Sequence, residues 1–271
     1  MEDVSVITSD PLSCIEHTVL NSISLRLSPG EWVQIAGANG SGKSTLVKLL
    51  TGQLGMTYRV EGKVTRGFAG RHPVPYVMQH PEASMIGMTP WEDVLIGLEQ
   101  QDIPEERIMS GVERALLQTG LSEIKQRPVD RLSGGQRQLT AIAGCLASEA
   151  PLLVLDEATS MLDAESRRKV LTAVRKLNRE GTTVVWVTHR MEEWEPGDRV
   201  IALERGRLIY DGDTDGFFTG GTGGGASVCE RLGWEPPYTV QTAQELIQLG
   251  YTVQPLPLTA EALKEAVAVW K

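Results

Sequence analysis

A glycine-rich loop between an apolar run and a helical pattern is the feature that most constrains the fold. Residues 37–45 read GANGSGKST, and the run WVQIA directly before them is mostly apolar and of strand length. After the loop, residues 46–50 place leucine and valine at positions that suit a helix packed on that strand. A strand, a glycine loop and a helix in this order are typical of a phosphate-binding loop, in which backbone N–H groups curl around an anion. The sequence therefore predicts an α/β fold with a phosphate site at the end of a buried strand.

The pattern G-x-x-x-x-G-K-S assigns a role to each part of this loop. Lys43 would reach the β- and γ-phosphates of a nucleotide, and the Ser44 hydroxyl would be a ligand of Mg²⁺. The plainer alternative is a glycine turn before a helix with an incidental lysine, and the strand–loop–helix context argues against it. The residues predicted to hold the nucleotide here are Gly37, Ala38, Asn39, Gly40, Ser41, Gly42, Lys43, Ser44 and Thr45.

Two further apolar runs of strand length, residues 152–155 and 183–187, flank a helical pattern at 166–177. Strands that are apolar throughout, joined by a helix, are typical of a parallel sheet covered on both faces. Asp156 and Glu157 follow the first of these strands, at the edge where parallel sheets bind ligands. Asp156 would hold Mg²⁺ through water, and Glu157 would act as general base on the attacking water.

Two polar residues end other apolar strands. Gln79 closes the segment YVMQ, and His189 closes WVTH. Gln79 would contact Mg²⁺ and water, and His189 would donate a hydrogen bond to a γ-phosphate oxygen. Either residue alone would more often be an ordinary polar group at a strand end, but their order along the chain favours the functional interpretation.

The segment LSGGQ at residues 132–136 forms a second potential anion site before a helical pattern. The chain already has one phosphate loop, so this second site needs a phosphate from elsewhere. Two subunits arranged head to tail satisfy this need, with each LSGGQ capping the nucleotide of the other and Ser160 near the seam. The residues predicted to meet the neighbour's nucleotide are Leu132, Ser133, Gly134, Gly135, Gln136 and Asp163.

Composition excludes some classes of function. The formal net charge is −9, so the whole chain carries no basic footprint for nucleic acid. We find neither a signal-peptide pattern at the start nor an apolar stretch near the ~20 residues that a membrane helix needs. The three cysteines are scattered without metal-type spacing, which suits a reducing compartment.

The order of these motifs resembles that of ATP-binding-cassette ATPases. The further segments VMQHPEASMIGMTPWEDVLIGLE, DRLSGGQRQLTAIAG and DEATSMLD are similar to those of the ATPase subunits of energy-coupling-factor transporters. Residues 230–267 also resemble the C-terminal domain of that family, which helps to hold the ATPase pair together. The resemblance implies a P-loop α/β fold: a mixed, mostly parallel sheet with helices on both faces, an N-terminal antiparallel β part, an α-helical subdomain and a small C-terminal module.

The expected domain organisation follows from this resemblance and from the glycine run GGTGGG. We expect an ATPase domain at 1–215 with its helical subdomain at about 85–147, a linker at 216–225, and a small dimerisation-type module at 226–271. Within the module, Thr242 and Glu245 have the spacing of a capping box for a helix that ends near Gly250.

The resemblance also implies function and partners. It implies hydrolysis of ATP with Mg²⁺ by a peripheral subunit on the cytoplasmic face of the cell membrane, which powers uptake of a vitamin or transition-metal ion. A transmembrane coupling subunit would dock near residues 79–88, and a separate membrane protein would bind the substrate. The SML before Asp163 favours a heterodimer with a paralogous ATPase over a homodimer. No nucleic-acid partner is expected.

The sequence departs from the family pattern at three points, and it leaves two other functions open. Family members usually carry an aromatic residue ahead of the phosphate loop that stacks on adenine, whereas no aromatic residue precedes Trp32. The adenine ring would then rest on a residue such as Ile15 or His17, or on a smaller contact, and the selectivity for the base stays open. Ala164 replaces a common proline, and GGTGGG is a local insertion. The alternatives are a soluble ATPase of this fold acting on nucleic acid, ribosomes or metal clusters, and a nucleotide-binding regulator without meaningful hydrolysis.

Overall fold

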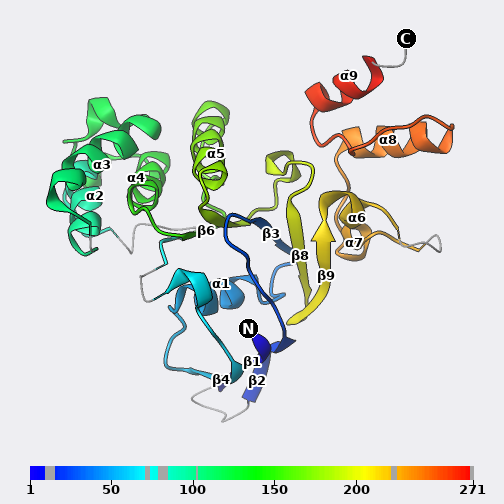
Figure 1. The fold of residues 1–271 in the computed structure, drawn as a ribbon, viewed down its shortest axis with the longest axis horizontal. Coiled ribbons are helices and arrows are strands. Elements are labelled where there is room, and N and C mark those ends of the chain that lie inside the picture. The colour runs from blue at the N-terminus through cyan, green and yellow to red at the C-terminus, as the bar shows by residue number, and fades with distance from the viewer. Residues whose placement is uncertain (10–15, 71–73, 79–84, 102, 221–224, 269–271) are drawn as a thin grey trace.

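The computed structural model describes residues 1–9, 16–70, 74–78, 85–101, 103–220 and 225–268 (Figure 1). Its central sheet has the strand order β5-β6-β7-β3-β8-β9, and only β9 runs antiparallel to its neighbour. The strands are β3 (Trp32–Gly37), β5 (Tyr76–Val77), β6 (Leu152–Asp156), β7 (Thr183–Val187), β8 (Arg199–Glu204) and β9 (Arg207–Asp213). The predicted mixed, mostly parallel sheet is confirmed.

A second, antiparallel sheet lies at the N-terminal end of the chain. Its order is β2-β1-β4, formed by β1 (Glu2–Ser9), β2 (Glu16–Ile23) and β4 (Tyr58–Lys63). The predicted antiparallel β part is confirmed. Figure 1 shows this sheet below the central one, beside α1 (Lys43–Thr51).

The central strands are buried on both faces, as their continuous apolar runs predict. Along β6, Leu153 and Leu155 belong to the core beneath α5 (Ala164–Arg179), whereas Leu152 and Val154 belong to the core around α1. This alternation follows from the two-residue period of a strand. Each face therefore buries its own apolar layer, and Figure 1 shows α1 and α5 on opposite sides of the sheet.

Three helices form a group beside the sheet, on the left in Figure 1. They are α2 (Pro90–Glu99), α3 (Glu105–Gln118) and α4 (Gly134–Ala147). Thr89 caps α2, because its hydroxyl accepts a hydrogen bond from the Glu92 N–H at 3.2 Å, and Pro90 occupies the first helical position. Buried side chains such as Val94, Val112 and Ile142 join the three helices to the core beneath α5. Short 3-10 turns occur at Gly67–Ala69, Ser122–Ile124, Val129–Arg131 and Met191–Glu193.

The described residues of the C-terminal part form the helices α6 (Thr214–Phe218), α7 (Val228–Arg231), α8 (Tyr238–Gln248) and α9 (Ala260–Ala268). They share one apolar cluster with β8, here called the C-terminal cluster. Its buried members are Ala36, Trp194, Val200, Ala202, Phe217, Phe218, Cys229, Leu232, Val240, Ala243, Val253, Leu256 and Leu258. The cluster therefore has members on both sides of the glycine run that the sequence suggested as a linker. The domain boundaries themselves stay a prediction.

The predicted capping box at Thr242 is wrong. Helix α8 begins at Tyr238 after Pro237, and the Thr242 hydroxyl donates instead to the Tyr238 carbonyl one turn earlier, at 2.8 Å. Proline fixes the backbone at the start of a helix without a side-chain cap, and this signal was overlooked. A capping box does start α7, where Ser227 and Glu230 bond to each other's N–H groups.

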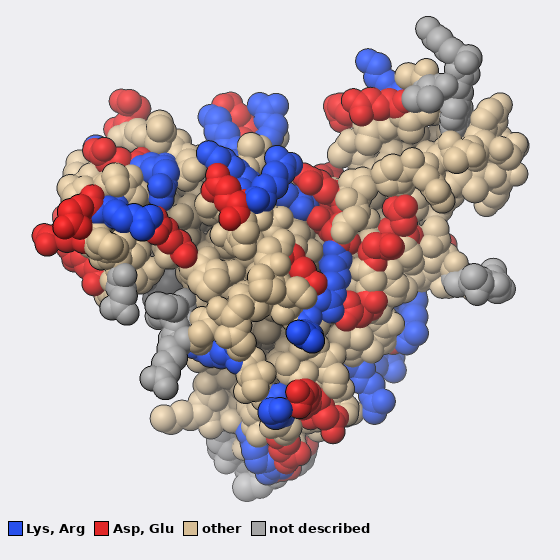
Figure 2. Space-filling model, in the orientation of Figure 1, with Lys and Arg blue, Asp and Glu red and all other residues tan. Residues whose placement is uncertain are grey.

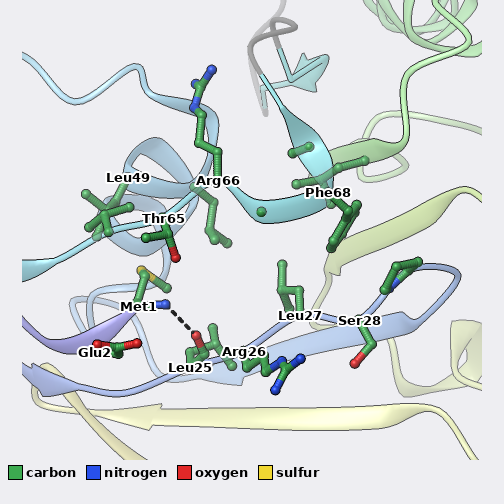
Figure 3. A pocket seen from close by; sticks show the side chains of 16 residues that line it. Met1, Glu2, Leu25, Arg26, Leu27, Ser28, Leu49, Thr65, Arg66 and Phe68 are labelled. Atoms are coloured by element: carbon green, nitrogen blue, oxygen red, sulfur yellow. Dashed lines mark hydrogen bonds between the residues drawn. The ribbon is translucent and has the colours of Figure 1, made fainter.

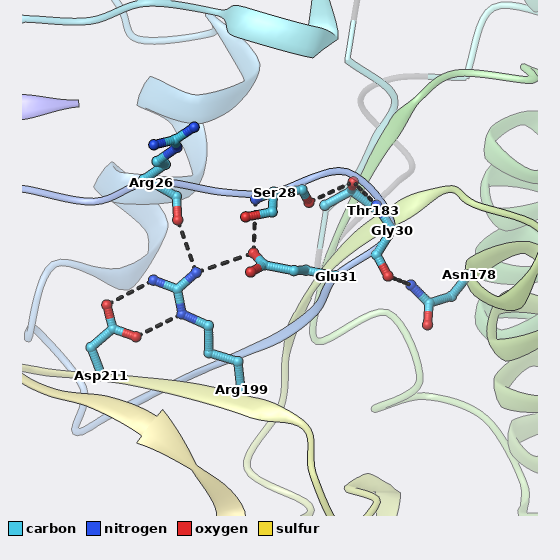
Figure 4. Close-up of polar contacts among 8 residues, drawn as sticks. All are labelled: Arg26, Ser28, Gly30, Glu31, Asn178, Thr183, Arg199 and Asp211. Carbon is cyan, nitrogen blue, oxygen red and sulfur yellow. Dashed lines mark hydrogen bonds and ion pairs between the residues drawn. The ribbon is translucent and has the colours of Figure 1, made fainter.

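Polar contacts hold the loop ahead of β3 (Figure 4). The Arg199 guanidinium binds both carboxylate oxygens of Asp211, at 2.6 and 2.7 Å, and also the Glu31 carboxylate at 3.1 Å. Residues 28–31 form a turn, in which the Glu31 N–H donates to the Ser28 carbonyl and Gly30 has φ 74°. These contacts fix where β3 starts, and therefore where its far end presents the glycine loop.

A buried ion pair joins α5 to the sheet. The Arg175 guanidinium contacts both carboxylate oxygens of Asp198 at 2.6 Å, and the Gln34 amide donates to the same carboxylate at 2.9 Å. The guanidinium also stacks over the Trp32 ring, with its carbon 3.5 Å from the ring centroid. Breaking a buried pair leaves an uncompensated charge, so each partner depends strongly on the other.

We predict that Asp198→Ala lowers the free energy of unfolding by about 3–5 kcal/mol, because it removes the buried carboxylate that contacts the Arg175 guanidinium twice. The half-exposed Glu195 carboxylate, 3.4 Å from the same guanidinium, is a weaker counter-ion. Arg59→Ala is the matched control, since it removes an exposed ion pair with Glu16 and should change stability far less. Denaturant unfolding of the purified chain measures both values. Equal losses for the two variants would contradict the role given to the buried pair.

Candidate functional site

The candidate site lies where the parallel strands end together. Asp156 at the end of β6 is in register with Val187 at the end of β7, and Val187 is in register with Ile35 of β3. The carboxyl ends of parallel strands meet at one edge of a sheet. The structure therefore places the glycine loop after β3, the acidic pair after β6 and His189 after β7 on the same edge.

The glycine loop has a backbone that only glycine adopts easily. Gly37 has φ 151°, and a Cβ there would lie 2.5 Å from both the Leu203 carbonyl oxygen and the Ser41 hydroxyl. Gly42 has φ 103° and caps the start of α1, which has no side-chain cap. Residues 38–40 at the tip are exposed. The loop thus leads its backbone N–H groups around a turn that ends at a helix N-terminus, as an anion site requires.

Lys43 is held at the centre of this loop. Its ammonium group donates to the carbonyl oxygens of Gly37 at 2.7 Å and Ala38 at 3.1 Å. Burial lowers the pKa of Lys43, and the carboxylates of Glu157 and Asp156 oppose that shift. The ammonium group therefore lies between the loop and the acidic pair, where it can exchange the carbonyl contacts for stronger charge-assisted bonds to phosphate.

Asp156 is buried and bonded to groups from two other elements. Its carboxylate accepts a hydrogen bond from the Tyr76 hydroxyl at 3.2 Å and another from Ser44. Burial raises the pKa of Asp156, while the bond from Tyr76, the charge of Lys43 and the bond from Ser44 lower it. Sequence reasoning missed Tyr76, although it lies in the YVMQ segment that was examined for Gln79.

Glu157 has a backbone conformation that is rare for its residue type. Its φ is 49°, and its N–H donates to the Val187 carbonyl at 2.9 Å. This left-handed backbone conformation costs a residue other than glycine about 1–2 kcal/mol. The hydrogen bond to β7 must therefore hold Glu157 in it. One carboxylate oxygen then lies 3.1 Å from His189 Nε2. The structure thus brings together the residues predicted as general base and as phosphate hydrogen-bond donor.

Glu193 connects the loops that follow Glu157 and His189. This buried carboxylate accepts hydrogen bonds from the Thr159 hydroxyl at 2.7 Å and from the Trp186 indole N–H at 2.9 Å. Thr159 belongs to the loop after Glu157, and Glu193 follows His189 in the chain. Glu193 therefore ties the two loops to each other, a role that no spacing in the sequence suggested.

The LSGGQ segment is arranged as a helix start. Ser133 caps α4, with its hydroxyl accepting from the Gln136 N–H at 3.2 Å and its own N–H donating to the Gln136 side chain at 3.0 Å. Leu132 is buried, whereas Ser133 is exposed. The N–H groups of Gly134 and Gly135 lie in the first turn, which has no intrahelical acceptors, so they can serve an external anion.

The segment at residues 160–163 lies against this helix start. A Cβ on Gly135 would be 3.3 Å from the Met161 carbonyl oxygen. Asp163 caps α5 by accepting from the N–H groups of Glu165 and Ser166 at 3.0 and 2.9 Å. The hydrogen bond from the Ser166 N–H, which has the larger effect, and the one from the Ser166 hydroxyl lower the pKa of Asp163. A cavity of about 510 Å³ is lined by residues of both segments, including Ser133, Gln136 and Asp163.

A larger cavity, of about 610 Å³, lies at the opposite edge of the sheet (Figure 3). It is lined by Leu152, which starts β6, and by Met1, Leu25, Leu49 and Phe68. Because a strand rises about 3.3 Å per residue, Leu152 is roughly 13 Å from Asp156 along β6. This cavity is therefore separate from the candidate site.

Two residues predicted to contact the metal ion or the adenine ring, Gln79 and Ile15, lie outside the described residues. His17 is exposed on β2, where it pairs with Thr8 of β1. The contact to an adenine ring therefore stays a prediction.

Comparison with known proteins gives consistent matches. A family model described as ABC transporter matches residues 20–160. The chain is 36% identical over 265 residues to the energy-coupling factor transporter ATP-binding protein EcfA1 of Halalkalibacterium halodurans, covering 93% of this chain and 91% of that protein. It is also 36% identical over 242 residues to EcfA of Methanosarcina acetivorans, covering 86% of each.

Solved structures give the same picture. The dimeric post-hydrolysis state of the ATP-binding cassette MJ0796 bound to ADP and Pi matches with a TM-score of 0.64 and 26% identity, covering 79% of this chain and 100% of that chain. The structure of cbiO1 from Clostridium perfringens, part of the ABC transporter complex cbiONQ, matches with a TM-score of 0.59 and 28% identity, covering 78% and 88%.

We predict that Lys43→Ala weakens nucleotide binding by about ten- to a hundredfold, because it removes a charge-assisted contact to phosphate. Isothermal titration with a non-hydrolysable ATP analogue measures the affinity. Lys48→Ala is the control on the same helix and should retain it. An unchanged affinity in the Lys43 variant would rule out the assigned contact.

Proposed function

This chain belongs to the ABC transporter family of ATP-binding proteins, and we propose that it is the ATP-hydrolysing subunit that powers an energy-coupling-factor importer as one half of a dimer. The observation that carries this proposal is the meeting of Lys43, Asp156, Glu157 and His189 at one edge of the sheet, each on its own supporting contacts. The relatives that match over most of the chain are ATP-binding proteins of such transporters.

ATP binding and hydrolysis follow from these contacts. The glycine loop and Lys43 would bind the β- and γ-phosphates. Glu157 would accept a proton from the attacking water, and His189 would donate a hydrogen bond to the phosphate. In this structure His189 Nε2 and a Glu157 carboxylate oxygen lie 3.1 Å apart. The attacking water and the γ-phosphate would therefore bind between these two side chains or beside them. A closed dimer would place the neighbour's LSGGQ against the same phosphate and exclude bulk water.

Magnesium fits the oxygen groups at this edge. The Ser44 hydroxyl and the Asp156 carboxylate already bond to each other, and oxygen ligands are those that Mg²⁺ prefers. We propose that Ser44 binds the ion directly, that Asp156 holds it through water, and that Gln79 completes the set. When bound, the ion would neutralise charge on the phosphates. Lys43, Glu157 and His189 would do the remaining work on the nucleotide and water.

We propose that a transmembrane coupling subunit docks beside α2. Ile86 and Met88 are 68% and 74% exposed there, and Asp93 accepts hydrogen bonds from the N–H groups of Ile86 and Gly87 at 2.7 and 3.0 Å. Apolar side chains on a backbone held this way suit a helix from a partner. Among the described residues, no helix is both long and apolar enough to span a bilayer. The substrate-binding membrane protein would be contacted only indirectly, and the chain would lie on the cytoplasmic face.

We further propose that residues 226–271 help to hold the ATPase pair together, and that the second ATPase is a paralogue. Large apolar side chains are exposed on and after α8, with Tyr238 at 65%, Leu249 at 74% and Tyr251 at 49%. Figure 2 shows the surface of α8 as mostly uncharged, whereas lysine, arginine, aspartate and glutamate are interspersed over the helices on the left and centre. That mixture, with the net charge of −9, favours a protein partner over nucleic acid.

We predict that Glu157→Gln abolishes most turnover while preserving ATP binding, because the amide cannot accept the proton of water. The variant should accumulate as an ATP-bound dimer, which light scattering after size exclusion detects. Glu180→Gln, an exposed change at the end of α5, is the control and should hydrolyse ATP at the normal rate. Full turnover by the Glu157 variant would remove it from the proposed mechanism.

Purification from detergent-solubilised membranes tests the partners. We expect a tagged chain to retain a multi-spanning membrane protein and a second, different ATPase. Replacing Ile86 and Met88 with glutamate should release the membrane protein and spare the ATPase pair. Recovery of nucleic acid or ribosomes, with no membrane protein, would favour the soluble alternative instead.

A further inference from the structure

Trp234 of the C-terminal part contacts the predicted catalytic histidine. It lies in the loop between α7 and α8, and its ring centroid is 5.4 Å from that of His189, with the two planes at 67°. This is an edge-to-face contact of the kind that aromatic rings prefer. Two segments about 45 positions apart in the sequence therefore meet at the nucleotide site.

The backbone of Trp234 is held firmly by the end of α7. Its N–H donates to the Cys229 carbonyl at 3.0 Å, and its own carbonyl accepts from the Cys229 thiol at 3.6 Å. Gly233, with φ 74°, allows the turn that reverses the chain here. Cys229 is fully buried in the C-terminal cluster, so the position of Trp234 depends on how that cluster is packed.

The side chain of Trp234 extends from this cluster toward His189. On the cluster side its ring lies 6.3 Å from that of Phe217. His189, in contrast, has a side chain that is 40% exposed, with a contact to Glu157 at 3.1 Å. The Trp234 ring thus packs against one side of an imidazole that is partly open to solvent.

We propose that Trp234 is a positioning residue that holds the His189 imidazole toward the γ-phosphate, so that hydrolysis depends on the seating of the C-terminal cluster. This inference rests on the proposed ATPase function. Trp234 acts through His189 alone and takes no part in the chemistry. A rearrangement of the C-terminal part on pairing or on docking would thus reach the hydrolytic site through one aromatic contact.

Nuclear magnetic resonance of the purified full chain tests the contact without any catalysis. The chain has four histidines, and His189→Ala identifies the signal of His189 by its loss. Trp234→Leu keeps an apolar side chain against the cluster but removes the aromatic ring. We expect it to shift the His189 imidazole resonances well beyond any shift of the other three. An unchanged His189 signal would overturn the contact.

Turnover of the assembled complex tests its consequence. We expect Trp234→Leu to lower kcat by about three- to tenfold with the KM for ATP unchanged, the effect of losing one aromatic pair. Trp234→Phe should recover most of the loss. Val6→Ala, a buried change in the N-terminal antiparallel sheet and outside the C-terminal cluster, should lower thermal stability and retain kcat.

A double-mutant cycle separates positioning from a general structural role. In the His189→Ala background, measured by single turnover at high enzyme concentration, Trp234→Leu should have no further effect. An equal loss in both backgrounds, or full kcat in Trp234→Leu, would overturn the inference. If the unaltered complex fails to hydrolyse ATP, the proposed function fails instead, and the resonance shift still reports on the contact.

Discussion

The parallel pairing of β3, β6 and β7 is the constraint on which the rest of the site depends. Each strand ends at the same edge, so the glycine loop, the acidic pair and His189 become neighbours although they are far apart in the sequence. The Glu157 N–H continues this pairing by donating to the Val187 carbonyl, and that bond holds Glu157 at a positive φ. Strain at this residue is thus maintained by the sheet itself.

Buried polar groups then fix the loops that leave these strands. Glu193 joins the loop after Glu157 to the segment after His189, and Arg175 bonds to the Glu193 carbonyl as well as to Asp198. The same guanidinium therefore connects the hydrolytic loops to β3 through Gln34. Since each of these groups is buried, losing one would leave its partners unsatisfied. Buried contacts therefore hold these loops from the side of the sheet, whereas residues 38–40 of the glycine loop and His189 are exposed.

Much of this arrangement could be predicted from local patterns. The apolar runs of β6 and β7 predict buried parallel strands, and the glycine loop after β3 predicts the phosphate site, because both signals are contained in short segments. Contacts that join distant segments were missed. The Tyr76 hydroxyl on β5 donates to the Asp156 carboxylate on the neighbouring strand β6. Glu193 accepts a hydrogen bond from Thr159, which lies 34 positions earlier. The Trp234 ring, from the C-terminal part, contacts His189. No periodicity or motif encodes such pairs, because they arise only when the chain is folded.

We propose that the anion site at the LSGGQ helix start is completed by a nucleotide on another polypeptide. Its own serine and glutamine bond to each other, which leaves the N–H groups of the two glycines for an external group. The head-to-tail pair, the closed hydrolytic site and the effect of partners on turnover all follow from this geometry.

Site-directed photocrosslinking from position 133 measures whether this site meets a nucleotide loop of the same or of another polypeptide. A Ser133→Cys chain, free of its other cysteines and labelled with ¹⁵N, would carry a short photoreactive group and be mixed with unlabelled ATPase subunits, either copies or the sister protein. With ATP, we expect crosslinks from labelled position 133 to an unlabelled phosphate-loop peptide. Crosslinks that join only labelled peptides, at every mixing ratio and with or without ATP, would contradict it.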